Sequence, residues 1–119
     1  MKIAIAQQNY HIGNFSANVL KIIEAIAEAR AKGADLVLFS ELSVCGYPPR
    51  DFLEFDDFIE KCRAAIDQIK VHTTDIAVLV GAPDKNPDPK GKDLFNAAFF
   101  IYEGEVRDVV YKTCLPTYD

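Results

Sequence analysis

The chain opens with two short apolar runs on either side of a segment that has the periodicity of an amphipathic helix. Lys2 to Gln7 is apolar on both faces, which suits an interior strand covered on two sides, and Asp35 to Ser40 is a second apolar run. Between them, apolar residues recur every three or four positions: Val19, Leu20, Ile22, Ile23, Ile26 and Ala29. The order strand, helix, strand predicts a parallel pair joined by a right-handed crossover.

The sequence also indicates where the first helix begins and ends, and it predicts a second helix. Ser16 or Asn14 can accept a backbone N–H at the start of the first helix, and Gly33 is a natural stop. A second helix is predicted over residues 55–70, because apolar side chains again form one stripe: Phe55, Phe58, Ile59, Cys62, Ile66 and Ile69.

The second half of the chain contains strand signals. Three strands are predicted, at Ile76 to Val80, Leu94 to Tyr102 and Val106 to Lys112. Glu103-Gly104 suits a tight hairpin between the last two strands, and the polar segment Asp84 to Asp93 is expected to be an exposed connection. The resulting order, βαβαβββ, predicts an α/β (α+β) fold with helices beside a mixed sheet.

Size and charge narrow the classes of protein that fit. A chain of 119 residues is expected to form a single domain. It carries 13 Lys and Arg against 18 Asp and Glu, and the formal net charge of −5 argues against nucleic acid or an anionic membrane as partner. No apolar run approaches the ~20 residues that span a bilayer. Three cysteines without a CxxC spacing predict neither a disulfide framework nor a metal site, so the cytoplasm is the expected compartment.

The sequence predicts an unfinished sheet, because the last strand leads into a loop with Pro116 and no closing helix or strand is predicted after it. A sheet with a single helical layer would expose an apolar face. We therefore expect these residues to be a fragment or to need a partner surface.

Two ionisable residues stand at the carboxyl ends of predicted strands, where the loops of α/β sheets carry ligand sites. Glu41 follows an apolar strand, and partial desolvation beside Phe39 and Leu42 would favour general-base behaviour. Lys112 ends the last strand, and its charge would stabilise an oxyanion where water is excluded. The alternative interpretations are a solvated Glu at a strand end and a Lys that extends its ammonium group into water.

The surroundings of these two residues resemble a known family. Phe39 to Leu53 (FSELSVCGYPPRDFL) is similar to the first motif of the carbon–nitrogen hydrolase, or nitrilase, superfamily, an apolar strand ending in Glu. Tyr111 to Asp119 (YKTCLPTYD) resembles its second motif, a strand-end Lys followed by a Leu-Pro loop. GYPPRDFL and LPTYD are closer still to the glutaminase domain of glutamine-dependent NAD+ synthetases. Ala6 to Ile22 and Leu94 to Val106 match that branch in order and spacing.

The resemblance implies an αββα sandwich, with residues 1–119 as the N-terminal part of one glutaminase domain and only the first half of the sandwich. In this family a Cys attacks an amide carbonyl and forms a thioester that water cleaves. Glu41 matches the general base, and Lys112 matches the group that stabilises the oxyanion. Tyr47 and Tyr118 match aromatic residues that line the glutamine pocket.

The nucleophilic Cys of the family lies downstream of the Lys motif and therefore beyond this chain, which is expected to be inactive alone. Cys45, Cys62 and Cys114 are interpreted as structural, because a reactive thiol needs an electropositive and accessible site. In the parent enzyme the resemblance implies L-glutamine as substrate, and ammonia delivered to a synthetase domain that is absent here. That domain would amidate deamido-NAD+ using ATP and Mg2+; no cofactor is expected in this chain, and a homo-oligomer is expected.

Two other hypotheses fit the same residues. The first is a stand-alone amidase, nitrilase or carbamoylase of the same superfamily, which would share Glu41 and Lys112 and lack an ATP-dependent domain. The second is a catalytically inactive short protein that acts by association, since its unfinished sheet would offer an apolar face or an open edge to a partner.

Overall fold

The computed structural model describes residues 1–8, 14–40, 43–44, 55–85 and 94–112. The elements follow the order βαβαβββ that the sequence predicts. They are β1 (Ile3–Ile5), α1 (Phe15–Ala31), β2 (Leu36–Leu38), α2 (Phe55–Lys70), β3 (Ala77–Lys85), β4 (Leu94–Tyr102) and β5 (Glu105–Lys112).

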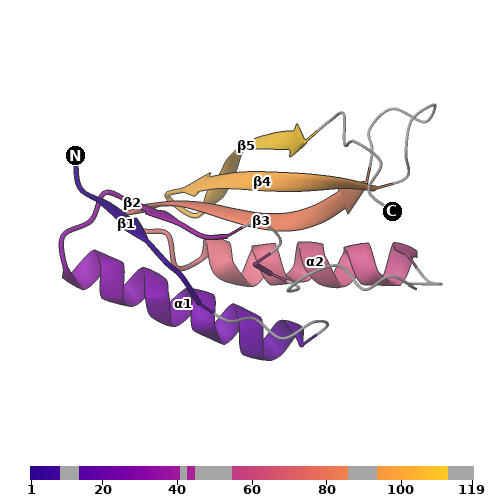
Figure 1. The fold of residues 1–119 in the computed structure, drawn as a ribbon, viewed down its shortest axis with the longest axis horizontal. Coiled ribbons are helices and arrows are strands. Elements are labelled where there is room, and N and C mark those ends of the chain that lie inside the picture. The colour runs from indigo at the N-terminus through magenta and orange to yellow at the C-terminus, as the bar shows by residue number, and fades with distance from the viewer. Residues whose placement is uncertain (9–13, 41–42, 45–54, 86–93, 113–119) are drawn as a thin grey trace.

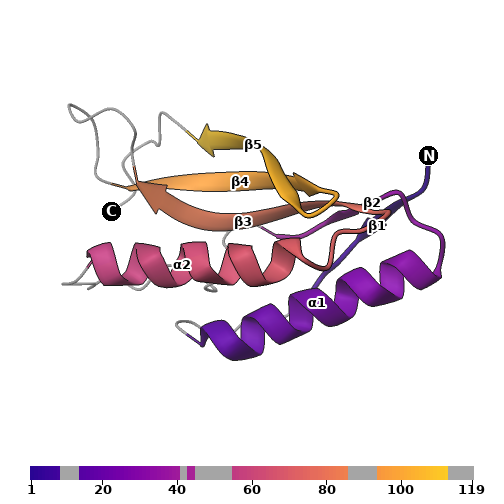
Figure 2. The same cartoon turned by 180° about the vertical axis from the view of Figure 1, so that it is seen from behind.

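The five strands form one mixed sheet in the order β1-β2-β3-β4-β5. The first three strands are parallel, whereas β4 is antiparallel to β3 and β5 is antiparallel to β4. Both helices lie against the same face of this sheet (Figure 1), and the view from behind gives the same arrangement (Figure 2). The described residues therefore form one helical layer and one sheet layer, the arrangement of a half of an αββα sandwich.

The core lies between the helices and the sheet. Alternate residues of each strand face the helices, as the period of two requires. The large, fully buried aliphatic residues come from both the helices and the strands, and they include Ile22, Ile26, Ile59, Ile69, Ile76, Ile101, Val37, Val78 and Val80. Burial of so many aliphatic side chains is the main source of stability for this pair of layers.

Helix α1 begins and ends where local chemistry favours it. The Asn14 side chain accepts a hydrogen bond from the Ala17 N–H at 3.1 Å, so Asn14, one of the two predicted capping residues, is the N-cap. Gly33 lies beyond the helix with φ of 80°, a conformation that glycine adopts without strain. Leu20, which we expected in the apolar stripe, is 57% exposed because it lies outside the face that contacts the sheet.

Strand β1 differs from the sequence expectation of an interior strand covered on two sides. In the described residues it is the edge of the sheet, and Ile3 and Ile5 are 50% and 70% exposed. Only Ala4, between them, packs against the core. A strand that is apolar on both faces is suited to burial on both sides of a sheet, and among the described elements α1 covers one side only.

The sheet face opposite the helices is apolar, as we expected for a sheet with one helical layer. Ile5, Leu38, Leu79 and Phe100 occupy one register row across four strands of this face. Val110, further along β5 on the same face, is 59% exposed. No described helix or strand packs on these residues.

Strand β3 is longer than predicted and continues through Gly81, Ala82 and Pro83 to Lys85. The expectation that Asp84 begins an exposed connection is wrong, because Asp84 is a paired residue of β3 and is only 5% exposed. Proline is tolerated here because Pro83 lies past the last residue of β3 that pairs with β2. The rest of that connection, residues 86–93, lies outside the described residues.

The predicted hairpin between β4 and β5 is present. Glu103 and Gly104 both have positive φ, 52° and 78°, as two-residue hairpin turns of type I′ require. A Cβ added at Gly104 would meet only the Lys70 carbonyl oxygen, at 4.0 Å, so space does not restrict this position. The constraint on residue 104 is therefore its backbone conformation.

We predict that Gly104→Ala lowers the free energy of unfolding by about 1 kcal/mol, because an L side chain with a Cβ is strained in this conformation. Gly104→Asn is the matched control and is expected to cost less, since Asn tolerates positive φ better. Denaturant unfolding followed by circular dichroism measures both. Equal losses of stability for Gly104→Ala and Gly104→Asn, or no loss for Gly104→Ala, would contradict the positive φ described for residue 104.

Candidate active site

The topology brings the carboxyl ends of β2 and β5, the two strands next to the motif residues in the sequence, to one edge of the sheet. Strand β2 is parallel to β3, and β5 is also parallel to β3 because each is antiparallel to β4. The carboxyl ends of β2, β3 and β5 therefore meet at the same edge. Glu41 follows β2 in the sequence, and Lys112 is the last residue of β5. This edge is where open α/β sheets carry their ligand sites.

The chain on both sides of residues 41 and 42 is attached to β3. Before them, the Phe39 N–H donates to the Leu79 carbonyl at 2.9 Å, and after them the Val44 N–H donates to the Gly81 carbonyl at 3.0 Å. The Gly81 N–H in turn donates to Ser43 Oγ at 3.3 Å. Glu41 itself lies outside the described residues.

Helix α1 contributes a third attachment to this segment. Asn18 is fully buried, and its Nδ2 donates to the Val44 carbonyl oxygen at 3.2 Å. Ser43 and Val44 are also buried, at 1% and 0% exposed. The sequence reasoning did not find Asn18 or Ser43; a polar residue within the buried stripe of an amphipathic helix is the signal for Asn18.

Lys112 ends β5 opposite Asn96 of β4, and Asn96 is opposite Pro83 of β3. Since neighbouring strands lie about 4.8 Å apart, the backbones of Lys112 and Pro83 are separated by roughly 10 Å. Strand β5 therefore ends two register rows beyond Gly81, whose carbonyl oxygen accepts the hydrogen bond from Val44 after Glu41.

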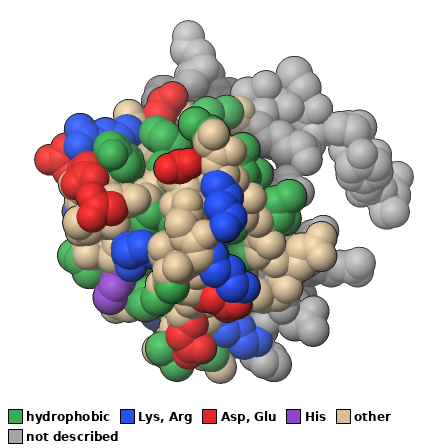
Figure 3. Space-filling model, turned by 90° about the vertical axis from the view of Figure 1, so that its left-hand side faces the viewer, with side chains coloured by type: hydrophobic (Ala, Val, Ile, Leu, Met, Phe, Trp, Pro, Cys, Tyr) green, Lys and Arg blue, Asp and Glu red, His purple; other side chains and the backbone are tan. Residues whose placement is uncertain are grey.

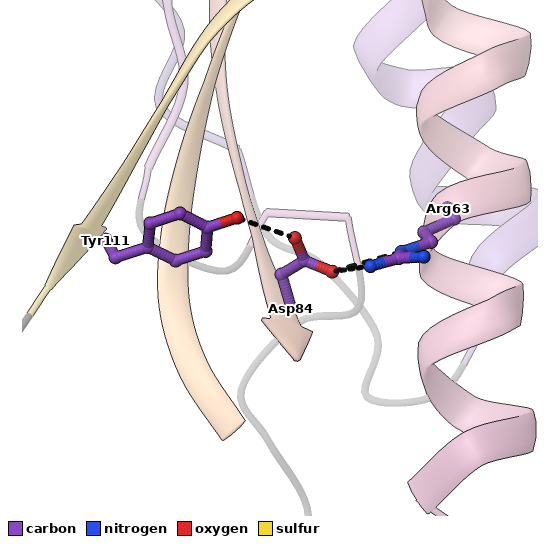
Figure 4. A network of polar contacts seen from close by, with 3 residues as sticks. All are labelled: Arg63, Asp84 and Tyr111. Carbon is purple, nitrogen blue, oxygen red and sulfur yellow. Dashed lines mark hydrogen bonds and ion pairs between the residues drawn. The ribbon is translucent and has the colours of Figure 1, made fainter. Parts of the chain in front are cut away.

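A polar network lies beside this edge, on the helix-facing side of the sheet (Figure 4). Arg63 of α2 donates to Asp84 Oδ1 through Nε at 3.1 Å and Nη2 at 3.0 Å. The Tyr111 hydroxyl donates to Asp84 Oδ2 at 3.2 Å. Burial raises the pKa of Tyr111, as do the charge of Asp84 and the hydrogen bond to it, while the Arg63 charge lowers that pKa. The three residues join α2, β3 and β5.

Sequence reasoning missed this network because it assigned Asp84 to a solvated loop. Val78, Val80 and Ala82 are buried, and Asp84 continues the same alternation. A carboxylate on the buried face of a strand needs a partner, and that requirement is the signal that would have indicated an ion pair.

The remaining predicted residues divide into two groups. Cys62 is 1% exposed within the apolar face of α2, which agrees with its interpretation as a core residue. Tyr47, Tyr118, Cys45 and Cys114 lie outside the described residues. Within the described ranges, no group of three or more His, Cys, Asp or Glu side chains is placed to hold a metal ion.

The surface gives two further findings. Acidic, basic and hydrophobic side chains are interspersed on the face seen from the left of Figure 1, so the described part of that face carries no continuous basic patch (Figure 3). Neither described helix combines the length and the apolar character needed to cross a membrane.

The described residues form an α/β fold in which one helical layer covers one sheet and β2, β3 and β5 have their carboxyl ends at one edge. The family model for carbon–nitrogen hydrolases matches residues 2–117, and the chain therefore belongs to the carbon–nitrogen hydrolase family. This finding confirms the resemblance inferred from the two motifs.

Individual relatives agree with the family. The chain is 40% identical over 121 residues to a glutamine-dependent NAD(+) synthetase from Synechocystis sp., with 98% of this chain and 22% of that protein covered. A crystal structure of a glutamine-dependent NAD(+) synthetase from Cytophaga hutchinsonii superposes with a TM-score of 0.85 at 25% identity, with 96% of this chain and 19% of that one covered. An amidase from Nesterenkonia sp. superposes with a TM-score of 0.77 at 25% identity, with 99% and 44% covered. The chain thus spans about a fifth of the length of the synthetases it matches.

We predict that Asn18→Ala lowers the free energy of unfolding by about 1–3 kcal/mol, because the buried Val44 carbonyl loses a hydrogen-bond donor. The control is Glu24→Ala, at an exposed position of the same helix, which is expected to change stability by less than about 0.5 kcal/mol. Denaturant unfolding measures both variants. Equal stability of Asn18→Ala and the control would contradict the described hydrogen bond.

Proposed function

We propose that residues 1–119 are the N-terminal part of a glutaminase domain that releases ammonia from L-glutamine within a glutamine-dependent NAD+ synthetase. The observation that carries the proposal is that β2, which precedes Glu41 in the sequence, and β5, which ends at Lys112, have their carboxyl ends at one edge of one sheet in a carbon–nitrogen hydrolase. Similarity to synthetases over nearly the whole chain supports the choice of substrate.

In the proposed reaction, Glu41 accepts the proton of a cysteine thiol while the sulfur attacks the amide carbon of glutamine. The amide oxygen becomes an oxyanion, and the ammonium group of Lys112 stabilises its charge. Glu41 then gives the proton to the departing nitrogen, which leaves as ammonia and yields a thioester. Water that has lost a proton to Glu41 cleaves the thioester, releasing glutamate and restoring the thiol.

The cysteine belongs to a part of the protein downstream of this chain. A variant of the Nesterenkonia amidase supports such a nucleophile, because its structure records Michael addition of acrylamide at the active-site cysteine. Tyr47 and Tyr118 are proposed to line the glutamine pocket. The released ammonia would amidate deamido-NAD+ in a separate synthetase domain that binds ATP and Mg2+. We also propose a cytoplasmic homo-oligomer.

We predict that Glu41→Gln in the full-length protein abolishes NAD+ formation from glutamine and preserves NAD+ formation from free ammonia. Loss of the general base should reduce the glutamine-dependent rate by about 100-fold or more. Glu24→Gln, on the exposed side of α1, is the control and should leave both rates unchanged. Equal activity of Glu41→Gln with both nitrogen sources would reject the proposal.

A second prediction concerns the 119 residues alone. A folded sample of this chain, checked by circular dichroism, is expected to release no ammonia from glutamine, because it has the proposed base and oxyanion group and lacks the nucleophile. A coupled ammonia assay measures this. Ammonia release that disappears in Cys114→Ser would place the nucleophile inside the chain and overturn the prediction.

Two specific observations favour alternatives. Similarity to the Nesterenkonia amidase favours a stand-alone amidase, which would hydrolyse amides and form no NAD+ from either nitrogen source. The apolar sheet face favours a protein that acts by association, for which Glu41→Gln would have no effect on function.

A further inference from the structure

We propose that the Asp84–Tyr111 hydrogen bond is a tether that positions the carboxyl end of β5, and with it Lys112, for the glutaminase reaction. Asp84 and Tyr111 are positioning residues in this proposal, since Lys112 is the group assigned to the reacting atoms. The inference rests on the proposed function. It adds a contact between Asp84, which lies outside both sequence motifs, and Tyr111, which begins the second motif.

Within the described part of the chain, β5 has a neighbouring strand on one side only. It is the outermost described strand on its side of the sheet and pairs only with β4. Its residues 105–108 are exposed, and Val110 is 59% exposed on the face without helices. Val109 and Tyr111 are the residues of β5 that pack against the core. A strand held mainly by one ladder of backbone hydrogen bonds opens more readily than a strand buried between two neighbours.

The tether reaches across an intervening strand. Tyr111 of β5 lies opposite Ala97 of β4, and Ala97 lies opposite Ala82 of β3. Ala97 and Ala82 are both buried and have small side chains. The Tyr111 ring extends from β5 across β4 toward Asp84 (Figure 4).

The acceptor is itself fixed in place. Asp84 is 5% exposed, and its other carboxylate oxygen accepts two hydrogen bonds from Arg63. A hydrogen bond to an ionised and buried acceptor is stronger than one between neutral groups. The Tyr111 hydroxyl therefore links β5 to a carboxylate that is already attached to α2.

Tyr111 is the residue directly before Lys112, so the tether acts one residue from the proposed oxyanion group. A cation assists only when it lies close to the developing negative charge, and a displacement of about 1 Å can reduce a rate by about 100-fold. Removing the hydroxyl should therefore affect the chemical step more than the binding of glutamine.

The test is Tyr111→Phe in the full-length protein, which removes one hydroxyl and keeps the ring. We expect kcat for glutamine-dependent NAD+ formation to fall about tenfold, with KM for glutamine within about twofold and ammonia-dependent formation unchanged. Backbone amide exchange over residues 109–112 is expected to accelerate, while exchange at the Glu103-Gly104 turn stays the same. Tyr102→Phe, at an exposed tyrosine near that turn, is the matched control and should change none of these quantities.

Each outcome decides one point. Unchanged kcat, unchanged exchange over residues 109–112, or equal loss of the glutamine- and ammonia-dependent rates would overturn the positioning role. Wild-type protein that makes NAD+ from ammonia and not from glutamine would reject the proposed function instead. In that case the exchange measurement still decides whether the tether holds β5.

Discussion

Backbone pairing along both edges of β3 holds the sheet and the candidate active site in one frame. Strand β2 and then residue 44 bond to one edge of β3, and β4 pairs with the other edge from Val78 to Lys85. Because β3 extends further than β2, its last residues also reach the row in which β5 ends. The carboxyl ends of β2, which precedes Glu41 in the sequence, and of β5, which ends at Lys112, are therefore related through this one strand, although 70 residues lie between Glu41 and Lys112.

The same extension places a carboxylate inside the protein. Burying Asp84 without partners would be costly, and Arg63 and Tyr111 remove that cost by donating to both of its oxygens. The Arg63 side chain is 58% exposed, so solvent screens its ion pair, whereas the Tyr111 hydroxyl bonds on the sheet side. The Tyr111 hydroxyl, which donates to the buried Asp84 carboxylate, thereby links β5 through Asp84 and Arg63 to α2.

The two faces of the sheet have opposite environments. One face is closed by α1 and α2, and the other presents an apolar row that no described residue covers. Apolar surface of this kind normally marks an interface. The finding agrees with a half of an αββα sandwich and with a chain that spans about a fifth of the synthetases it matches.

Local patterns in the sequence determined the element order, the bounds of α2 and the β4–β5 turn, because helix stripes and turn residues are encoded by neighbouring residues. The family followed from the resemblance of two short motifs to a known family. Tertiary structure decided the rest. Gly81-Ala82-Pro83 resembles a strand end locally, and only pairing with β4 extends β3 through it. The burial of Ile3 and Ile5 depends on which helices or sheets pack against β1, and the alternation of residues within the strand does not predict that packing. Asp84 and Tyr111 are 27 residues apart in the sequence. They meet because the register of the sheet places both side chains on the same face, with only β4 between their strands.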